Sequence, residues 1–319
     1  EAKAKAVFNF ETRLADIQWE RTENRKIEKT NNPYKIGELK NLTDTIDWVA
    51  WFERYGVSGV DDLNVYQPTY ISALGDLLGE TDLETLKAYF QHKIIREFAP
   101  YLSAEIAEVN FDFASGVLRG IEEQPPRWKR GVRTVNRSMG EALGRIYVEK
   151  HFSPEAKARM DALVGDLLSE FEKSIAGLDW MSEETKQKAQ EKRSKFTAKI
   201  GYPNKWRDYS NLKVDAEDLV GNVRRSAKFE FDYDLAKLGR PIDREEWGMS
   251  PQTVNAYYSS RQNELVFPAA ILQYPFFDMG AEDAMNYGGL GPVIGPENGL
   301  ALDDPGRKLK GAGHVETWW

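Results

Sequence analysis

The sequence predicts a mainly α-helical fold whose last part mixes helices with short strands. Two observations support this class. Through residues 82–200, apolar residues recur at spacings of three and four, behind residues that commonly begin helices. After Pro251 the period shortens, and β-prone runs alternate with turn-forming residues. The composition changes near residues 200–206, which predicts a helical domain over residues 1–203 and a mixed domain over residues 204–319.

Two long helices are predicted before residue 180. Thr81 and Glu84 have the spacing of a capping box, in which two side chains bond free backbone amides at the helix start. Ser153 precedes Pro154, which a first helical turn tolerates because its amide would lack a partner there. Each start precedes an apolar stripe, the pattern of a helix with one side against a core. The stripes are Leu83, Leu86, Phe90, Ile94 and Ile95, and Met160, Leu163, Val164, Leu167, Leu168, Phe171 and Ile175.

Two further helices and a hairpin are predicted downstream. Ser182, followed by two glutamates that favour the positive end of the helix dipole, begins one helix. Asp215 caps the other, which runs toward Gly239. The runs 254–258 and 265–267 are β-prone and are separated by polar residues, so they predict a hairpin.

Composition excludes several functional classes. The 319 residues include 51 acidic and 43 basic ones, a net charge of -8, so there is no broad basic face for nucleic-acid phosphates. Zero cysteines exclude disulfides, thiolate nucleophiles and thiolate metal sites. No apolar run approaches the roughly 18 residues of a membrane span. Because the chain begins at Glu1 without methionine, we expect a processed or fragmentary start.

Three runs near the C-terminus carry a family resemblance. They read Val-Asn-Ala-Tyr-Tyr at 254–258, Asn-Glu-Leu-Val-Phe-Pro-Ala-Ala-Ile-Leu-Gln-Tyr-Pro-Phe-Phe at 263–277, and Asn-Tyr-Gly-Gly-Leu-Gly at 286–291. Together they strongly resemble the neprilysin and endothelin-converting-enzyme family of zinc endopeptidases. The resemblance is specific over residues 254–319 and weaker over the preceding helices.

This resemblance implies a fold, a cofactor and a substrate class. The fold is a helical cap domain followed by the start of an α+β thermolysin-like catalytic domain, truncated in this chain. The family binds zinc, cleaves peptides and acts in the periplasm or outside the cell. Its vertebrate members are disulfide-rich, so a cysteine-free chain indicates a bacterial-type member. Nothing in the sequence indicates the oligomeric state.

The family's zinc motif is altered in this chain. The family pattern G-H-E-x-x-H-x-F-D-D-x-G-R aligns with residues 295–307 without a gap. Two histidines spaced by four residues would share one helical face and bind one zinc ion. Their positions are occupied by Pro296 and Leu300, whose side chains cannot bind metal. The catalytic glutamate of the family remains as Glu297.

The surrounding residues complete this interpretation. Asp303 and Asp304 align with the family's paired aspartates and are the remaining candidates for groups that support the site. The family's third zinc ligand belongs to a downstream E-x-x-x-D motif, and the chain ends at Trp319 before it. Pro296 inside the expected helix costs roughly 3 kcal/mol and Gly299 about 1 kcal/mol, so we expect this helix to be broken. No zinc cofactor is predicted.

The resemblance assigns Asn255 and Ala256 to a strand that binds the main chain of a peptide substrate. A strand edge presents unpaired N–H and C=O groups, and an extended peptide can add to it as another strand. The alternative is an ordinary hairpin in which Asn255 caps its neighbours. We favour the peptide cleft because the similarity continues through Phe277.

Other residue groups give weaker signals. The three histidines lack ligand spacing, the acidic doublets diverge on any regular element and are expected at the surface, and an aromatic cluster is expected to pack in a core. These groups are His92, His151 and His314; Asp61-Asp62, Glu122-Glu123 and Glu245-Glu246; and Tyr274, Phe276 and Phe277.

The sequence therefore predicts a neprilysin-like metallopeptidase homologue that binds oligopeptides and is inactive as written. A positioned general base such as Glu297 supplies typically 10²- to 10⁴-fold, whereas enzymes accelerate reactions by roughly 10⁶-fold or more. Two alternatives stay open. One is an active zinc metalloendopeptidase, if residues 296–315 are altered or the parent chain is longer. The other is a helical interaction or inhibitor module that has lost the chemistry.

Overall fold

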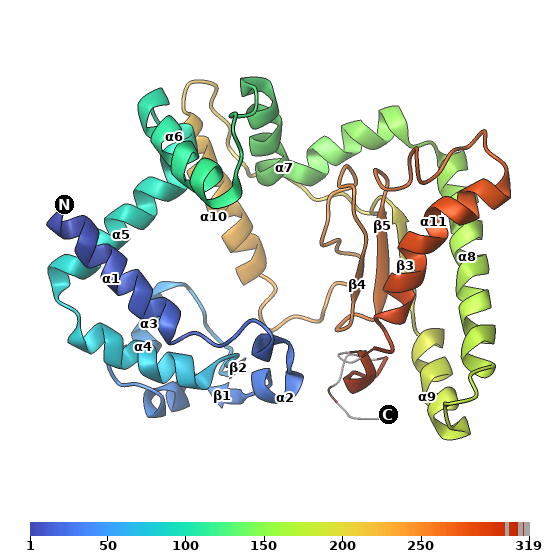
Figure 1. The fold of residues 1–319 in the computed structure, drawn as a ribbon, viewed down its shortest axis with the longest axis horizontal. Coiled ribbons are helices and arrows are strands. Elements are labelled where there is room, and N and C mark those ends of the chain that lie inside the picture. Colours follow the sequence, from blue (N-terminus) through green and yellow to red (C-terminus); the bar gives the residue numbers. More distant parts are fainter. Residues whose placement is uncertain (304–305, 312–314, 316–319) are drawn as a thin grey trace. The chain divides into compact units, whose positions relative to one another are not determined.

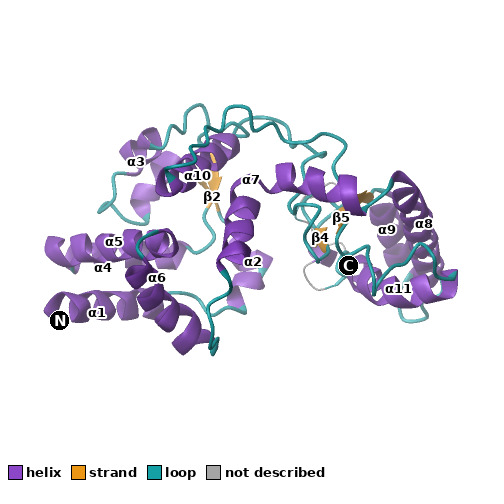
Figure 2. Cartoon of the chain, turned by 90° about the horizontal axis from the view of Figure 1, so that it is seen from above, coloured by secondary structure: helices purple, strands orange, loops and turns teal. Residues whose placement is uncertain are grey.

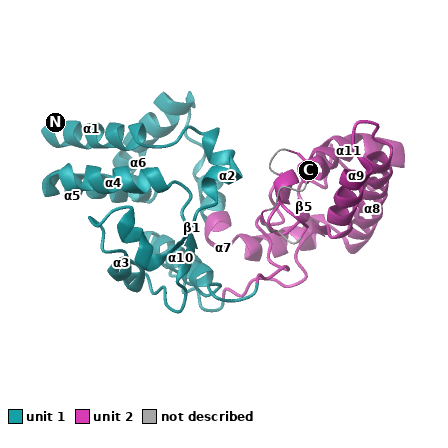
Figure 3. Ribbon diagram, turned by 90° about the horizontal axis from the view of Figure 1, so that it is seen from below, with its two compact units in different colours: residues 1–134, 210–241 teal, residues 135–209, 242–319 magenta. Residues whose placement is uncertain are grey.

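The structure is a computed structural model that describes residues 1–303, 306–311 and 315 (Figure 1). Helices dominate and strands are short (Figure 2), which confirms the predicted mainly α-helical class. The chain divides into two compact units (Figure 3). Unit 1 comprises Glu1–Thr134 and Ser210–Pro241, and unit 2 comprises Val135–Tyr209 and Ile242–Trp319.

Unit 1 consists of helices and one two-stranded ladder. The α1 and α5 helices pack together, with the rings of Phe10 and Tyr89 edge to face at 4.9 Å between centroids. Strands β1 and β2 are antiparallel. The elements are α1 (Ala2–Asp16), η1 (Glu23–Arg25), α2 (Ile27–Thr30), β1 (Pro33–Lys35), η2 (Ile36–Asn41), α3 (Trp48–Arg54), β2 (Asp62–Asn64), α4 (Pro68–Glu80), α5 (Leu83–Phe98), η3 (Ala99–Tyr101), α6 (Ala104–Phe111), η4 (Asp112–Val117) and α10 (Leu219–Leu235).

Helix α5 differs from its prediction in start and in packing. Its cap is Asp82 rather than Thr81, and the Asp82 carboxylate accepts the Thr85 backbone N–H at 2.9 Å. The stripe expected to face a core is largely exposed, because α1 packs on the neighbouring side of the helix, which carries Ala88 and Tyr89. The exposed fractions are 63% for Leu83, 58% for Phe90, 60% for Ile94 and 54% for Ile95.

Unit 2 combines a small sheet with long helices (Figure 1). Helix α7 (Arg127–His151) begins in unit 1 and continues into unit 2, and its backbone leaves helical geometry at Met139, with φ -150° and ψ 53°. The other elements are α8 (Pro154–Ala176), α9 (Glu183–Ser194), β3 (Thr197–Gly201), β4 (Tyr257–Ser259), β5 (Glu264–Pro268), α11 (Asp283–Gly299) and η5 (Gly306–Lys308).

The sheet has the strand order β3-β5-β4. Strand β3 runs parallel to β5, with Lys199 opposite Val266, and β4 runs antiparallel to β5, with Tyr258 opposite Leu265. The predicted hairpin is thus confirmed. All of β5 is buried, as a central strand covered on both faces should be. Strand β4 therefore lies at an edge of this sheet.

Helix α8 confirms the second predicted helix. The Ser153 hydroxyl accepts the Ala156 backbone N–H at 3.2 Å, and the apolar stripe faces the main core. Met160 is 0% exposed and Val164 is 1% exposed. Both belong to the cluster that includes Phe267 of β5 and Leu290 of α11. The core therefore fixes the hairpin and α11 against the same helix.

Of the remaining two predicted helix starts, one is confirmed and one is wrong. Ser182 caps α9, where its hydroxyl accepts the Thr185 N–H at 3.2 Å. Helix α10 begins after Asp218, whose carboxylate accepts the Gly221 N–H at 2.8 Å. Asp215 was expected in that role, but its carboxylate accepts the Glu217 N–H in the preceding turn.

The two units interleave along the sequence. Strand β3 precedes residue 203, while β5, its partner, follows it. Residues 210–241 return to unit 1 between them. The units reflect contacts within this structure, whereas the division into 1–203 and 204–319 is inferred from the change in composition near residues 200–206, so that division stays a prediction.

Candidate functional site

The residues predicted to bind a peptide lie just before the edge strand. Asn255 is exposed, and its backbone N–H donates to the Thr253 carbonyl at 3.0 Å. Ala256 is 8% exposed and belongs to the main core of unit 2. Strand β4 begins at the next residue. The core thus holds the side chain of Ala256 while the backbone enters the edge of the sheet.

Glu297 reaches this strand from α11. The helix packs against β4, and the backbone N–H of Tyr258 faces the Glu297 carboxylate. Burial raises the pKa of the Glu297 carboxyl group, and the Tyr258 backbone N–H lowers that pKa by a smaller amount. The structure therefore brings the predicted general base next to the predicted substrate strand.

The pairing within the sheet indicates which way the backbone of the strand faces. Backbone groups alternate between the two sides of a strand along the chain. Asn263 and Ala269 bond to β3, so Leu265 also turns its backbone groups toward β3. Tyr258, which lies opposite Leu265, therefore does not bond to β5. The N–H and C=O groups of Ala256, two residues earlier, face the same free side. Glu297 occupies the Tyr258 end of this edge, so an added peptide would meet Ala256.

The two altered zinc positions lie on α11 and directly after it. Pro296 is exposed, and its carbonyl accepts the backbone N–H of Leu300 at 3.0 Å. The helix runs unbroken over Asp283–Gly299, so the prediction of a broken helix is wrong. Its two prolines, Pro292 and Pro296, are exposed, and water can there bond the carbonyls that lose a helical partner. The opposite side, which carries Ile294, is buried in the core.

The residues at this position do not fit a zinc ion. Proline and leucine offer no side-chain donor, so Glu297 is left as a single side-chain ligand among positions 296, 297 and 300. Zinc sites need three or four converging ligands. Among residues 1–303, 306–311 and 315, no three His, Cys, Asp or Glu side chains are grouped to hold a metal ion. His92 and His151 are exposed, and His314 lies outside the described residues.

The turn after α11 contains the first of the paired aspartates. The Asp303 carboxylate accepts the Gly306 backbone N–H at 3.1 Å, and Asp304 lies outside the described residues. Sequence reasoning missed the neighbour that binds this turn, Lys192, which is 3% exposed. The Lys192 ammonium donates to the carbonyls of Ala301 at 2.8 Å and Gly306 at 2.5 Å. Burial lowers the pKa of Lys192 to about 8, while the charge of Asp303 raises it by less.

Asn263 is the second residue that sequence reasoning missed. It is 0% exposed and has φ +53°, a left-handed conformation in which Asn is enriched. Its side-chain oxygen accepts the Tyr258 hydroxyl at 2.8 Å, and its amide donates to the Lys192 carbonyl at 3.0 Å. Because Asn is enriched in this conformation, an Asn at the end of a predicted hairpin turn could have indicated it. Lys192 gave no signal, since it lies in a strongly charged helix.

The opposite side of the strand is also polar and partly buried. The Tyr257 hydroxyl accepts the Gly248 backbone N–H at 2.8 Å. Burial raises the pKa of Tyr257 to about 12. An ion pair between Lys199 and Glu264, at 2.6 Å, lies within the sheet with 7% and 3% of the side chains exposed. Adjacent tyrosines of β4 therefore serve different hydrogen-bond partners.

The other groups from the sequence form no site. The doublets at 61–62, 122–123 and 245–246 are exposed except for Glu246, which is half-buried. Phe277 is buried, as expected, but Tyr274 is 83% exposed, so core packing is the wrong prediction for that residue. Tyr274 lies in a turn beside the exposed Pro275, whereas Phe276 is half-buried and Phe277 is buried.

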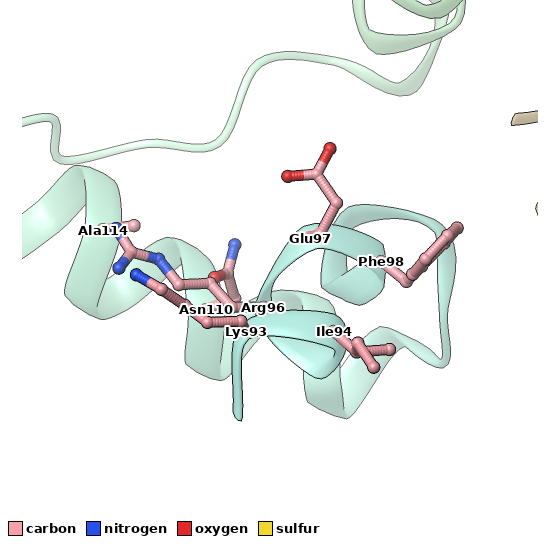
Figure 4. Close-up of a pocket in the computed structure, with 7 residues that line it drawn as sticks. All are labelled: Lys93, Ile94, Arg96, Glu97, Phe98, Asn110 and Ala114. Atoms are coloured by element: carbon pink, nitrogen blue, oxygen red, sulfur yellow. The ribbon is translucent and has the colours of Figure 1, made fainter. Parts of the chain in front are cut away.

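A hollow of about 650 Å³ lies in unit 1, between α5, α6 and η4 (Figure 4). Figure 4 shows Glu97 pointing away from the side chains of Lys93, Arg96 and Asn110. None of the residues predicted from the sequence to bind a peptide or carry catalysis lines this hollow. It therefore adds no group to the site at β4.

Across the part of the chain that the structure describes, no helix is both long enough and apolar enough to span a membrane.

Comparison with known proteins supports the resemblance along the whole chain. The N-terminal model of Peptidase family M13 matches residues 1–203, and the peptidase model of the same family matches residues 255–319. Endothelin-converting enzyme 1 of Mus musculus is 30% identical over 324 residues, which cover 98% of this chain and 42% of that protein. The endothelin-converting enzyme homolog of Locusta migratoria is also 30% identical, over 99% of this chain and 46% of that protein.

Solved structures give the same answer. The zinc metalloprotease Zmp1 of Mycobacterium tuberculosis, in complex with an inhibitor, superposes with a TM-score of 0.95 at 43% identity, covering all of this chain and 48% of that one. PepO of Lactobacillus rhamnosis gives a TM-score of 0.90 at 26% identity, over all of this chain and 51% of that one. The chain thus spans about half the length of these relatives. The matches confirm the predicted neprilysin and endothelin-converting-enzyme resemblance, and the chain belongs to Peptidase family M13.

Proposed function

We propose that this chain is a metallopeptidase homologue that binds extended oligopeptides along the free edge of β4 and does not hydrolyse them as written. One observation carries the proposal. Glu297 of α11 lies beside the edge strand, while the adjacent positions 296 and 300 hold side chains without metal donors. Binding at the edge needs only backbone groups, whereas hydrolysis needs an activated water.

The expected affinity is weak. Each main-chain hydrogen bond contributes a net of roughly 0.5 to 1.5 kcal/mol, and association itself costs at least about 4 kcal/mol. Glu297 faces the Tyr258 amide, which leaves the outward groups at Ala256 for the peptide. Side-chain specificity should be low, because backbone pairing does not read side chains.

Glu297 alone does not support efficient catalysis. A general base contributes typically 10²- to 10⁴-fold, well below the roughly 10⁶-fold of a modest enzyme. The donor set around Glu297 supports no bound zinc, so water activation by a metal is not part of this proposal. We place the protein in the periplasm or outside the cell, and treat it as a bacterial-type member, on the strength of the family and of the zero cysteines.

Peptide titration tests the binding site. A mixture of unstructured oligopeptides is titrated into the 319-residue chain by calorimetry or NMR. Ala256→Pro removes one outward N–H and distorts the edge, so it should abolish binding. Ala256→Gly keeps that N–H and is the matched control, in which binding should persist. Equal binding by both variants would place the peptide elsewhere.

Metal analysis tests whether the chain lacks bound zinc and zinc-dependent peptide cleavage. The purified chain should hold no stoichiometric zinc after dialysis, because the ligand positions offer no imidazole nitrogens. The double variant Pro296→His, Leu300→His supplies two ligands and should still fail to cleave a fluorogenic peptide, since zinc sites of this kind use three protein ligands. Cleavage by that variant, lost on adding Glu297→Gln, would contradict the proposal.

A further inference from the structure

Buried polar contacts join the edge strand to the turn after α11. The Tyr258 hydroxyl donates to Asn263 at 2.8 Å, and the Asn263 amide donates to the Lys192 carbonyl at 3.0 Å. The Lys192 ammonium then donates to the carbonyls of Ala301 and Gly306. These links connect β4, the hairpin turn, α9 and the turn that holds Asp303, all within unit 2.

The burial of this network makes its geometry specific. Asn263 is 0% exposed and Lys192 is 3% exposed, so water does not replace a lost partner. An unpaired polar group in such a place is costly, and a satisfied buried network restricts each member to one arrangement. The left-handed backbone of Asn263 adds a second constraint, because most other side chains are strained at φ +53°.

The network ends at the residue that contacts Glu297. The side chain of Tyr258 bonds Asn263, while its backbone N–H faces the Glu297 carboxylate. Fixing the ring therefore fixes the backbone of the strand beside α11. The neighbouring Tyr257 differs, since its hydroxyl accepts the Gly248 N–H and takes no part in the bond to Asn263.

We propose that Asn263 and Lys192 are positioning residues, which hold Tyr258 so that its backbone N–H meets Glu297 and the edge at Ala256 stays open to a peptide. This inference deepens the proposed function and rests on it for its purpose. It concerns residues that touch no peptide and act through Tyr258.

Hydrogen exchange of single amides, measured by NMR on the 319-residue chain, tests the positioning role. Tyr258→Phe removes the hydroxyl, and Asn263→Gly removes the amide while glycine keeps the left-handed backbone unstrained. Each should speed exchange at the residue-258 amide about fivefold, the effect of losing one hydrogen bond of ordinary strength. The Ala269 amide, which donates to the Gly201 carbonyl at 2.8 Å, should keep its rate.

A matched control and a double variant separate positioning from general loosening. Tyr257→Phe removes a comparable hydroxyl from the same strand and should leave the residue-258 amide unchanged. The double variant Tyr258→Phe, Asn263→Gly should exchange no faster than the faster single variant, because both changes break the same Tyr258–Asn263 hydrogen bond. Lys192→Met should also speed exchange at this amide.

Several outcomes would overturn the inference. An unchanged residue-258 amide in Tyr258→Phe, or an equal effect of Tyr257→Phe, would show that the network does not position the strand. If Asn263→Gly fails to fold, Tyr258→Phe, which deletes one oxygen, still decides. If the unmutated 319-residue chain binds no peptide, the proposed function is refuted. The exchange rates would still report on the positioning role.

Discussion

Helices α8 and α5 carry similar apolar repeats but meet different environments. On α8, Met160 and Val164 are 0% and 1% exposed within the main core of unit 2. On α5, Phe90 and Ile94 are 58% and 60% exposed. The repeat predicts a helix with an apolar side in both cases. Whether that side is buried depends on partners supplied by distant residues, which for α8 are β3 and α11.

The largest expected effect is on α8. Met160→Ala should lower the free energy of unfolding by about 2 to 5 kcal/mol, because it leaves a cavity in a fully buried core. Met285→Ala, at a methionine that is 69% exposed on α11, is the control and should change stability by less than about 0.5 kcal/mol. Urea unfolding followed by far-UV circular dichroism measures both. Equal effects would remove the contrast between buried and exposed helix faces.

Helix α11 has one side that is buried, like the apolar side of α8, and one that is exposed, like that of α5. The exposed side bears the prolines. Pro296→Ala restores a backbone N–H within the helix and should raise the free energy of unfolding by about 1 to 3 kcal/mol. Pro241→Ala, outside any helix, should have little effect. Thermal and urea unfolding test this, and a less stable Pro296→Ala chain would show that the helix has adapted its packing to the proline.

Lys192 tests whether a charge buried on α9 limits stability. Burial lowers its pKa from 10.5 to about 8 in the folded chain, so between these pH values the unfolded chain binds the additional proton. Stability from this group should therefore rise as the pH increases from about 8 to 10.5. Lys192→Met should lack that rise, and Lys188→Met, at an exposed lysine, should keep it. A parallel pH profile for parent and Lys192→Met would contradict the assignment.

The smallest effect is expected on α5. Ile94→Ser should change the free energy of unfolding by less than about 0.5 kcal/mol, because the side chain is 60% exposed and the two residues have similar helix propensities. Ile175→Ser, at an isoleucine of α8 that is 2% exposed, is the matched substitution and should be strongly destabilising. A large loss at Ile94 would show that the α5 stripe is covered in solution.

Local sequence signals predicted where helices and strands form better than they predicted what packs against them. Ser153 and Ser182 were readable because a hydroxyl before a helix bonds the free amides of the first turn. Thr81 and Asp215 failed because an aspartate one to three residues later took the same role, at Asp82 and Asp218. Such neighbours compete for the same amides, and single-residue preferences do not decide between them.

The candidate site shows the same limit. Family resemblance identified Ala256 and Glu297, and the structure brings their segments together. Their roles in binding stay proposals. Lys192 could not be predicted, because its burial depends on Ala301 and Gly306 lying against α9. The unbroken α11 was missed because a penalty for proline says nothing about which side of the helix faces water.

The parallel pair of β3 and β5 has a consequence for synthesis on the ribosome. Residues 197–201 leave the ribosome well before residues 264–268, and the intervening residues 210–241 belong to the other unit. During translation β3 must therefore wait for its partner with its backbone groups unpaired, and such exposed strands promote aggregation. A pause between the two strands would prolong this vulnerable period, so the yield of folded chain should depend on elongation speed across that interval.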